Sequence, residues 1–559
     1  MEMSGASATG GVPELKLVDP AEVVAEPSWP TEREKTRQCR QALLVGGLVT
    51  LPLVLFIVLG QESAATVWQI ASAKLTAMNG RGFMNADHGH DAEAGATATA
   101  TKAHDEFLGG LLAPDMDRRS CRSRLRAYEA RHRRCAPGTP LYAKTVEQLR
   151  SGRSADDTVE CNYVVWLPFD GLGNRMLSMV SGFLYALLTD RVFLAALPPA
   201  SDDLFCEPFP GTTWRLPADE FPVANLFGVG QHPEQSYSSL LDNKKISVPE
   251  DPAAANATTT AEAPPPVPPA YVYLSLGWQL TDRIFFCGEH QLAIKKVNWL
   301  LLYSDLYFAP SLYAVAEFQD ELRRLFPAKE SVTHLLARYL FHPTNSVWGL
   351  VTRYYRSYLA PADRRIGVQI RLNGMYGQIL ACSRQERILP ETDGGDELAG
   401  GGDGGNNNNV STTAILIASL YADCYERMRS RYYEHAARAA VGVFQPTHEE
   451  RQATDSLAHN RKALAEIYLL SFSEELLITG LPTFGYVASS LAGVRPTILL
   501  TPADHNVSAT PCRRAVFMEP CNLTPPRDVE CRGMAVDKED LERHVRVCED
   551  WKNGVKFFD

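Results

Sequence analysis

The stretch from residue 163 to 188 constrains the fold of this chain more than any other. It begins with a short apolar run, Tyr163–Leu167, whose β-branched and aromatic side chains predict a buried strand. A turn follows at Gly171 and Gly173, and from Asn174 onward apolar residues recur every three or four positions, which is a helical period. Strand, turn and helix form the first half of a βαβ unit. Free backbone N–H groups at the start of the helix suit an oxygen of a phosphate or a sugar.

This turn is not the fingerprint of a dinucleotide-binding protein. In a G-x-G-x-x-G motif, a third glycine would stand where the chain has Met176. The two glycines therefore have two interpretations. They let the chain turn tightly, or they bring the backbone close to a ligand, and the residues alone leave both open.

A regular alternation of strands and helices begins near Arg365. Apolar runs predict five strands, at Ile366–Ile370, Ala414–Ala418, Val441–Phe444, Glu475–Ile478 and Thr497–Leu500. Helical periods fill the gaps, notably at 464–471 and 486–491. This alternation predicts a parallel sheet covered by helices, with ligands at the carboxyl ends of its strands. The two α/β-rich halves, 155–345 and 360–505, predict two Rossmann-like domains with a cleft between them.

The composition excludes several classes of protein. The 559 residues are 45% hydrophobic and 22% charged, which is enough for two or three domains with a large core. The net charge of −11 argues against binding to nucleic acid, because phosphates repel an acidic surface. The twelve cysteines form no CxxC pairs, which argues against a zinc site. All but Cys39 follow the apolar segment described next. Those eleven are an odd number, so at least one is free or intermolecular if the rest pair.

The N-terminal region has the pattern of a membrane anchor. Residues 1–41 are expected to be a cytosolic tail, and the uncharged apolar run 42–60 is long enough to cross a bilayer. Basic residues precede that run, at Arg33, Lys35, Arg37 and Arg40. The next basic residue after it is Lys74, and this asymmetry predicts a type II orientation with the rest of the chain in the lumen. A cleaved signal peptide is the alternative, but its basic region would be far longer than usual.

Low-complexity segments and glycosylation sequons occupy the predicted lumenal side. Residues 61–106 are expected to be a stem, and 251–269 and 394–409 to be loop insertions that form no core. Four N-glycosylation sequons follow the anchor, at Asn256, Asn409, Asn506 and Asn522. Their placement agrees with a secretory topology.

Several separated blocks resemble one family of enzymes. The motif Gly-Leu-Gly-Asn-Arg-Met-Leu-Ser starts at Gly171, and Leu-Phe-Cys-Glu-Pro-Phe-Pro-Gly-Thr-Thr-Trp spans Leu204–Trp214. Gly-Val-Gln-Ile-Arg ends at Arg371, and Arg-Val-Cys-Glu-Asp ends at Asp550. These blocks resemble the plant cell-wall fucosyltransferases, of which the xyloglucan α-1,2-fucosyltransferase is the best-known member.

The resemblance implies an architecture. The family has an α/β fold with two Rossmann-like domains, an inverting fucosyltransferase variant of the GT-B type, behind an N-terminal transmembrane helix. It implies an acceptor-side domain over 107–359. It also implies a GDP-fucose-binding domain with a C-terminal tail over 360–559.

The strongest candidate for a site residue is Arg371. It follows the predicted strand Ile366–Ile370, at the edge where a nucleotide would lie, and the resemblance assigns the family's GDP-contacting arginine to it. A guanidinium there can grip a pyrophosphate and offset the charge of the leaving group. The alternative is a surface arginine at a strand end. The resemblance implies further donor-binding residues: Gly171, Gly173, Asn174, Arg175, Glu466, Thr483, Phe484, Gly485, Tyr486 and Asp550.

Three of these donor-site candidates have alternative explanations. Thr483 can serve simply as a helix N-cap. Glu466 can lie on a solvated helix face, and Asp550 can be an ordinary surface acid that does not contact guanine. Pro482 stands where the family has a serine, which removes one hydroxyl and one N–H from this turn and puts a phosphate contact in doubt.

Two further expectations concern the chemistry. Asp305 follows the apolar stretch 297–303 and is the candidate base that takes the proton of the acceptor hydroxyl. No metal site is expected, because the only DxD sequence, Asp115–Asp117, precedes every predicted strand, and the family works without a metal. No cofactor is expected beyond GDP-fucose as the donor.

The resemblance implies a Golgi enzyme that transfers L-fucose from GDP-fucose to a galactose hydroxyl of a cell-wall glycan such as xyloglucan. The expected partners are GDP-fucose, a galactose-terminated glycan and the Golgi membrane, but no nucleic acid; a homodimer is left open. Two alternatives remain. One is a fucosyltransferase for arabinogalactan proteins or another acceptor, and the other is a non-catalytic Golgi glycan-binding homologue.

Overall fold

The structure is a computed structural model of the whole chain. It describes residues 118–154, 160–227, 233–248, 267–278, 281–329, 332–392, 411–437, 439–500, 507, 509–526, 529, 531 and 541–558. All of them belong to one compact unit, Asp105–Asp559. The predicted tail, anchor and stem lie outside the described residues, as do the sequons at Asn256, Asn409 and Asn506. Within those described ranges, none of the helices combines the length and the apolar character that crossing a bilayer requires.

The first sheet has four parallel strands in the order β2-β1-β4-β3. The strands are β1 (Tyr163–Leu167), β2 (Val192–Ala195), β3 (Tyr271–Ser275) and β4 (Trp299–Tyr303). The predicted strand at β1 is confirmed with the same bounds, and all five of its side chains are buried. Helix α5 (Leu172–Leu188) follows the glycine turn and is buried almost throughout, which explains its wide apolar stripe.

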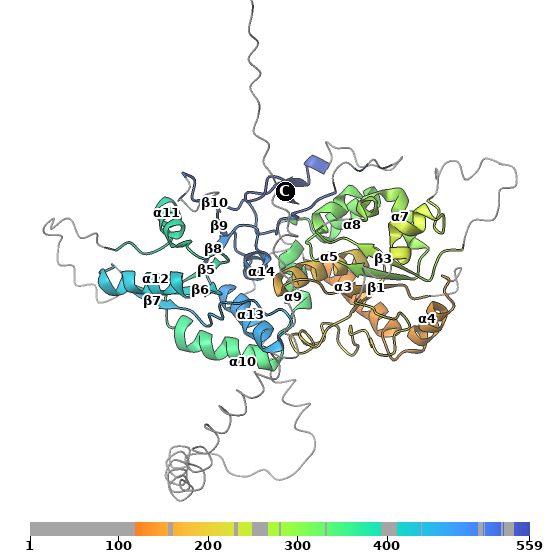
Figure 1. Ribbon diagram of the computed structural model, residues 1–559, viewed down its shortest axis with the longest axis horizontal. Helices are drawn as coiled ribbons and strands as arrows, with labels where there is room; N and C mark the ends of the chain where they lie inside the picture. The colour runs from red at the N-terminus through yellow and green to blue at the C-terminus, as the bar shows by residue number, and fades with distance from the viewer. Residues whose placement is uncertain are drawn as a thin grey trace, which may run out of the picture. The chain divides into compact units, whose positions relative to one another are not determined.

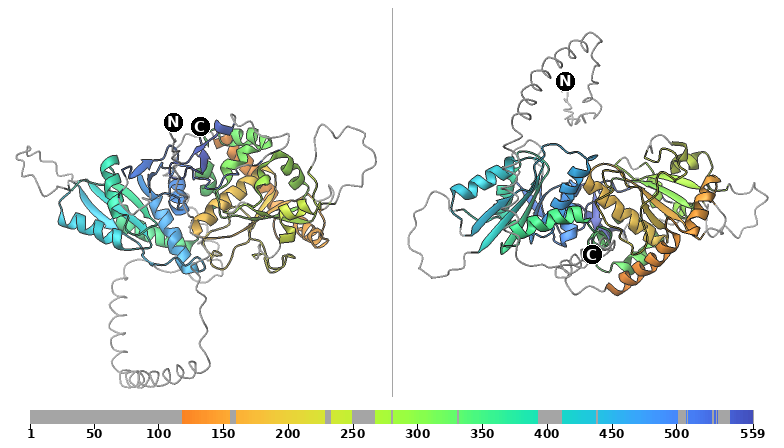
Figure 2. Two further views of the ribbon diagram at one scale, coloured as in Figure 1. Left: turned by 45° about the horizontal axis from the view of Figure 1, so that its top comes forward. Right: turned by 90° about the horizontal axis from the view of Figure 1, so that it is seen from below.

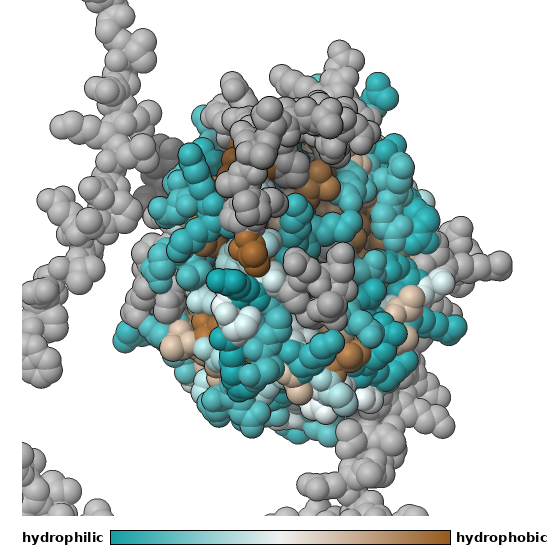
Figure 3. Space-filling view, turned by 90° about the vertical axis from the view of Figure 1, so that its right-hand side faces the viewer, coloured by the Kyte–Doolittle hydropathy of each residue, from teal (hydrophilic) through white to brown (hydrophobic). Residues whose placement is uncertain are grey.

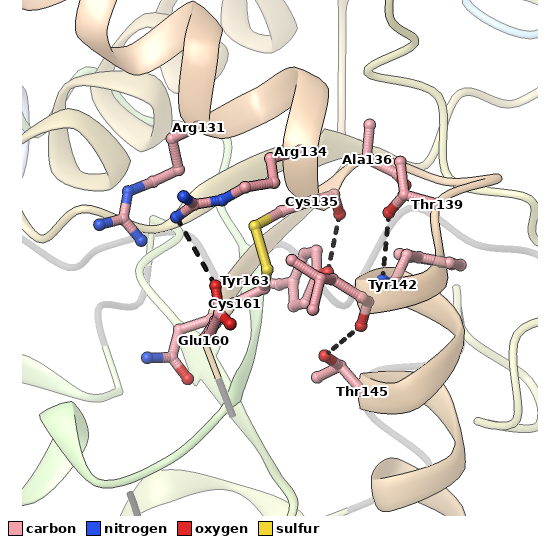
Figure 4. Close-up of a disulfide and its surroundings, with 12 residues drawn as sticks. Arg131, Arg134, Cys135, Ala136, Thr139, Tyr142, Thr145, Glu160, Cys161 and Tyr163 are labelled. Carbon is pink, nitrogen blue, oxygen red and sulfur yellow. Dashed lines mark hydrogen bonds and ion pairs between the residues drawn. A yellow bond between two sulfur atoms is a disulfide. The ribbon is translucent and has the colours of Figure 1, made fainter. Parts of the chain in front are cut away.

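Two N-terminal helices are tied to this sheet by a disulfide. Helix α3 (Arg118–Cys135) and helix α4 (Pro140–Arg150) precede β1, and Cys135 at the end of α3 is bonded to Cys161 (Figure 4). The Tyr163 hydroxyl donates a hydrogen bond to the carbonyl of Cys135, 2.8 Å away. The segments Arg118–Cys135 and Pro140–Arg150 are therefore helical and attached to the folded body.

The second sheet has six strands in the order β10-β9-β8-β5-β6-β7. Its parallel strands are β5 (Arg364–Ile370), β6 (Thr412–Ser419), β7 (Ala440–Phe444), β8 (Glu475–Thr479) and β9 (Thr497–Leu499). All five predicted strands are confirmed to within two residues at each end. The antiparallel edge strand β10 (Cys512–Arg514) was not predicted, nor was the hairpin of β11 (Val545–Val547) and β12 (Val555–Phe557). Each is three residues long, too short for a periodic signal.

Helices between the two sheets join them into one unit (Figures 1 and 2). Helix α14 (Thr483–Ala492) packs against α13 (Leu457–Leu470) on the side of the second sheet. It also packs against α5 and α9 (Val332–Leu340) on the side of the first. The other helices are α6 (Tyr237–Asp242), α7 (Gly288–Lys295), α8 (Ala316–Leu325), α10 (Asn345–Tyr354), α11 (Tyr376–Glu386) and α12 (Asp423–Glu434).

Short helical turns complete the described elements. They are η3 (Pro233–Gln235), η5 (Arg283–Phe286), η6 (Ala309–Ala314) and the π-helical turn η8 (Tyr355–Leu359). The face shown in Figure 3 is mostly hydrophilic, with small separate hydrophobic patches, as expected when the apolar surface is inside the fold.

The C-terminal tail returns to the first half of the chain. Disulfides Cys287–Cys531, Cys382–Cys512 and Cys521–Cys548 anchor it. The buried carboxylate of Glu519 accepts hydrogen bonds of 2.7 Å from the hydroxyls of Tyr307 and Thr333. The cysteines that remain free are Cys121, Cys206 and Cys424, which confirms that the odd number downstream of the apolar run leaves unpaired thiols.

Candidate active site

A cavity of about 470 Å³ opens at the carboxyl ends of both sheets. The segments that follow β1, β4, β5, β6 and β8 contribute to its wall, and so do α13 and the C-terminal tail. Its volume lies within the range of pockets that hold a small ligand. The predicted cleft at the strand ends is therefore present, with residues from both halves of the chain around it.

The N-termini of α5 and α14 meet at this cavity. The two helices approach so closely that a Cβ on Gly173 would lie 2.6 Å from Oγ1 of Thr483 and 2.9 Å from the amide nitrogen of Phe484. The hydroxyl of Thr483 donates a hydrogen bond to Oδ1 of Asn174, and the amide of Asn174 donates one to Asp170 over 2.6 Å. Gly173 thus has a packing role as well as lining the cavity, because only glycine permits this approach.

Neither helix start is capped by a side chain. Gly171 is the N-cap of α5 and Pro482 the N-cap of α14, and neither residue makes a capping hydrogen bond. The first-turn N–H groups and the positive ends of two helix dipoles are therefore available to an anion at the cavity wall. Pro482 removes its own N–H, but the N–H groups of the helical residues after it remain.

Arg371 lies where its position after β5 predicts. It lines the cavity, its side chain is exposed, and its backbone N–H donates to Oγ1 of Thr479 over 3.1 Å. Among the described residues, no carboxylate forms an ion pair with its guanidinium. A cation without a protein counter-charge in a concave site suits an anionic ligand.

Asp305 faces the same cavity from the segment after β4. Asp305 is only 6% exposed, and its Oδ1 atom has no hydrogen-bond partner among the described residues. Burial raises the pKa of Asp305, and backbone N–H groups partly offset that effect. A buried carboxylate with a free oxygen and a raised pKa is a stronger base than a solvated one.

Glu466 also lines the cavity, from α13. It is 7% exposed, and its carboxylate accepts a 2.6 Å hydrogen bond from the hydroxyl of Thr447. Burial raises the pKa of Glu466 from an ordinary value of 4.5 to about 8. The interpretation of Glu466 as part of a solvated helix face is wrong, because the side chain is buried at the site.

Sequence reasoning missed a charged cluster at the cavity. The carboxylate of Glu449 interacts with Nζ of Lys462 and with Nδ1 of His459. Hydrogen bonds from Lys462, which has the larger effect, and from His459 lower the pKa of Glu449. It also missed Trp278, which lines the cavity and is 56% exposed. His459 and Lys462 stand three positions apart on α13, a helical spacing that could have indicated that they share a face, but Glu449 and Trp278 lie in loops without a periodic signal.

Four predicted donor-site residues do not line the cavity. Arg175 is buried, and its Nη1 donates to Oγ of Ser201 over 3.1 Å. Gly485 lies against β8, since a Cβ on it would be 2.7 Å from that of Ile478. Its lack of a side chain permits helix–strand packing.

Tyr486 and Asp550 are the other two. The Tyr486 hydroxyl donates to Oδ2 of Asp550, which also accepts a 2.8 Å hydrogen bond from the backbone N–H of Leu481. Leu481 has a positive φ of 73°, a conformation that costs energy for a residue with a side chain. Asp550 therefore holds the loop at the cavity mouth and does not line the cavity itself.

The sequon at Asn522 does not fit a glycan. Asn522 is 1% exposed, and its Nδ2 donates to Oγ of Ser311 over 2.7 Å. A glycan on that nitrogen would have to displace packed protein, so the prediction of glycosylation at Asn522 is wrong in this fold.

Comparison with known proteins decides the family. A family model described as xyloglucan fucosyltransferase matches residues 123–532, which is more than half of the chain. The chain belongs to the xyloglucan fucosyltransferase family. Its relatives include a galactoside 2-alpha-L-fucosyltransferase of Pisum sativum, 41% identical over 491 residues, with 82% of each chain covered. A protein of the same name from Arabidopsis thaliana is 41% identical over 485 residues, which cover 81% of this chain and 83% of that one.

A solved structure gives the same picture. A variant of Arabidopsis thaliana FUT1 in complex with GDP matches with a TM-score of 0.68 and 39% sequence identity. The match covers 81% of this chain and all of that one. The α/β architecture with parallel sheets described above is therefore the architecture of a solved family member.

Proposed function

We propose that this protein is a fucosyltransferase that moves L-fucose from GDP-fucose to a galactose hydroxyl of a plant cell-wall glycan such as xyloglucan. The relatives named galactoside 2-alpha-L-fucosyltransferase support the reaction, and the GDP complex of a family member supports the donor. The observation that carries the proposal is that one cavity is lined both by Arg371 and by the buried carboxylate of Asp305. We assign the fold to an inverting variant of the GT-B type.

Arg371 neutralises the leaving group in this proposal. As the bond between fucose C1 and the β-phosphate oxygen breaks, negative charge grows on GDP. A guanidinium without a protein counter-ion can hold two phosphate oxygens through paired hydrogen bonds. The first-turn N–H groups of α5 and α14 add further donors at the same wall.

Asp305 is the proposed base. The acceptor oxygen attacks C1 of fucose on the face opposite the departing phosphate, which inverts the configuration. The hydroxyl proton passes to the carboxylate of Asp305, so the acceptor gains the fucosyl group and GDP leaves with its bonding electron pair. The raised pKa of Asp305, caused by burial, makes its carboxylate a stronger base than a solvated one.

We further propose that no divalent cation is required. Arg371 and two helix N-termini already supply positive charge where the pyrophosphate would lie. Among the described residues, two clusters have enough His, Cys, Asp or Glu ligands for an ion, but both depend on cysteines that are bonded in Cys287–Cys531 and Cys521–Cys548. A disulfide sulfur is not the thiolate that binds metals.

The cellular setting follows from the sequence pattern. An apolar anchor at 42–60 with basic residues before it supports a single-pass type II protein of the Golgi membrane, with its catalytic body in the lumen. The four disulfides of the body agree with an oxidising compartment.

The test is an assay of the purified chain with labelled GDP-fucose against a panel of xyloglucan, arabinogalactan and small galactosides. We expect label in xyloglucan carrying terminal galactose and none after the galactose is removed with a galactosidase. Transfer to arabinogalactan alone would favour the second acceptor class. Binding of glycan without any transfer would favour a non-catalytic homologue.

A further inference from the structure

A buried carboxyl group joins the C-terminal tail to the wall of the cavity. Glu519 is 3% exposed and lies two positions before Cys521, which lines the cavity from the tail. Its carboxyl group contacts Tyr307, which lines the cavity from the segment after β4, and Thr333, which lies on α9. Both partners are buried. One group thus connects three segments that lie far apart in the sequence.

Three oxygen atoms at this junction lie within hydrogen-bond distance of one another. Oε2 of Glu519, Oη of Tyr307 and Oγ1 of Thr333 are separated pairwise by 2.7 Å. The other carboxyl oxygen, Oε1, accepts a 2.8 Å hydrogen bond from the backbone N–H of Thr333. Each of the three contacts between oxygens needs one proton, because two lone pairs that face each other at this distance repel.

The protonation state of Glu519 decides whether all three contacts have a proton. The hydroxyls of Tyr307 and Thr333 supply one proton each. Both can donate to an ionised Oε2, but then no proton is left for the contact between the two hydroxyls. A protonated Glu519 supplies the third: Oε2 donates to Thr333, Thr333 donates to Tyr307, and Tyr307 donates back to Oε2. Because every oxygen then donates once and accepts once, the geometry favours the neutral acid.

The charges around Glu519 also favour its neutral form. The titratable groups around it are Tyr307, Tyr313, Tyr486, Glu549, Asp550 and Lys556. Lys556 is the cation of this set, and its Nζ lies 2.6 Å from Oε2 of Glu549, which offsets its charge. Within the part of the chain that the structure describes, no cation forms an ion pair with Glu519. A buried carboxylate without a counter-ion is costly, so the proton is retained.

The pKa values of these groups agree with the geometry. Burial raises the pKa of Glu519 from an ordinary value of 4.5 to about 7, and hydrogen bonds from Tyr307 and Thr333 and the charge of Lys556 partly offset that effect. Burial also raises the pKa values of Tyr307 and Tyr486 well above the ordinary value, so both phenols stay neutral.

We propose that Glu519 is a proton-dependent positioning residue: its neutral carboxyl group closes a ring of hydrogen bonds with Tyr307 and Thr333 that docks the C-terminal tail. Asp305 and Tyr307 lie two positions apart in one segment of the cavity wall, so the docked tail also fixes the segment that carries Asp305. When Glu519 loses its proton, the ring opens, a buried anion is left without a counter-ion, and the tail loosens.

Glu519 does not line the cavity, so it acts through Tyr307 and does not touch a substrate. Its effect on turnover rests on the function proposed above, because Asp305 is the proposed base. Its effect on the stability of the fold does not depend on that function.

The first test compares the pH dependence of unfolding in the wild type and in Glu519→Gln, which has a similar shape but cannot ionise. A group whose pKa is raised on folding stabilises the fold below its ordinary value and loses that contribution as pH rises through the folded value. The folding equilibrium constant of the wild type should therefore fall relative to that of the variant, by up to about tenfold per pH unit, between 4.5 and about 7. Glu542→Gln, which removes an exposed carboxyl group from the same tail, should behave like the wild type. Parallel profiles for the wild type and Glu519→Gln would overturn the proposal.

Two measurements on the wild type do not depend on how the variant folds. Amide hydrogen exchange over residues 516–523, corrected for the intrinsic rate, should be slower below about pH 7 than above it. Infrared spectra on either side of this pH should show a buried neutral carboxyl group that ionises. Because burial also raises the pKa of Glu466, the band is assigned to Glu519 by its loss in Glu519→Gln. Exchange that does not change with pH would contradict the docking of the tail by Glu519.

The rate of fucose transfer separates this inference from the proposed reaction. The wild-type kcat should decline as pH rises above about 7, and Glu519→Gln should lack this alkaline limb, which a merely structural role would not remove. Transfer by both proteins with the same alkaline limb would overturn the positioning role and leave the reaction standing. A pH-dependent difference in unfolding and exchange without any transfer would contradict the proposed reaction but support the docking of the tail by Glu519.

Discussion

Thr483 donates a hydrogen bond to Asn174 across 309 positions of sequence, and this contact joins the N-termini of α14 and α5. The two helices belong to different halves of the chain, and each follows a strand of a different sheet. The cavity wall proposed to hold the donor is therefore formed at the junction where the N-termini of α5 and α14 meet. Changes at the junction should affect the stability of the fold and the affinity for the donor together.

Gly173→Ala tests this junction. The added Cβ would meet Oγ1 of Thr483 and the backbone of Phe484, so the helices must separate. We expect a loss of about 1–3 kcal/mol in the free energy of unfolding and a higher KM for GDP-fucose. Gly349→Ala, where the Cβ meets only the end of the Arg353 side chain, is the matched control and should cost little. Denaturant titration and donor kinetics measure both effects, and unchanged values in Gly173→Ala would contradict the role of the junction.

Arg371→Ala should remove the charge that stabilises departing GDP. By analogy with the loss of one oxyanion-hole donor, kcat should fall about 10²–10³-fold. Because the side chain is exposed, the free energy of unfolding should change little. Arg371→Lys keeps the charge but not the paired hydrogen bonds, and should recover only part of the rate. Turnover close to wild type in a folded Arg371→Ala protein would dismiss this assignment.

Asp305→Asn should lower kcat about 10²–10⁴-fold, to a rate that is still measurable, and leave GDP affinity intact. The base works only when it is deprotonated, so the wild-type rate should fall as pH decreases through the raised pKa of Asp305, and the variant should lack that acid limb. Ionisation of Asp305 affects the stability of the fold in the opposite direction to its effect on the rate. A carboxyl group whose pKa is raised on folding destabilises the fold as pH rises through that pKa, so Asp305→Asn should be at least as stable as wild type at pH 7. A pH profile of kcat with its acid limb retained in the variant would contradict the role as base.

Asp550→Ala tests whether Asp550 stabilises the loop at the cavity mouth or recognises the guanine base of the donor. Loss of the hydrogen bonds to Leu481 and Tyr486 should loosen the loop at the cavity mouth and raise KM for GDP-fucose. The preference for GDP over UDP in competition assays should be unchanged, because Asp550 does not line the cavity. Tyr486→Phe removes one of the two contacts and should show a smaller effect in the same direction. A variant that loses selectivity between the two nucleotides would reinstate direct recognition of the base.

Chelation tests the proposed absence of a metal requirement. If Arg371 and the helix N-termini offset the charge of the pyrophosphate, activity should persist in excess EDTA. Added Mn²⁺ should give at most a modest gain. Rising salt should raise KM for the donor, because ions screen its attraction to Arg371. Activity that is lost in EDTA and restored by Mn²⁺ would contradict the mechanism.

The sequence by itself determined the elements that have a local signal. The apolar run at β1 and the helical period after Asn174 were sufficient to place a strand and a helix, and Arg371 could be placed at a strand end. Periodicity reports burial along one element, and a parallel sheet brings the carboxyl ends of its strands to one edge. The general location of the site was therefore predictable.

Only the tertiary structure decided which side chains meet there. Asp550 accepts hydrogen bonds from Leu481 and Tyr486, which lie more than sixty positions earlier in the chain. The burial of Asn522 likewise excludes a glycan that its sequon suggests. These outcomes depend on contacts between distant segments, and no short-range period encodes the packing that brings such segments together.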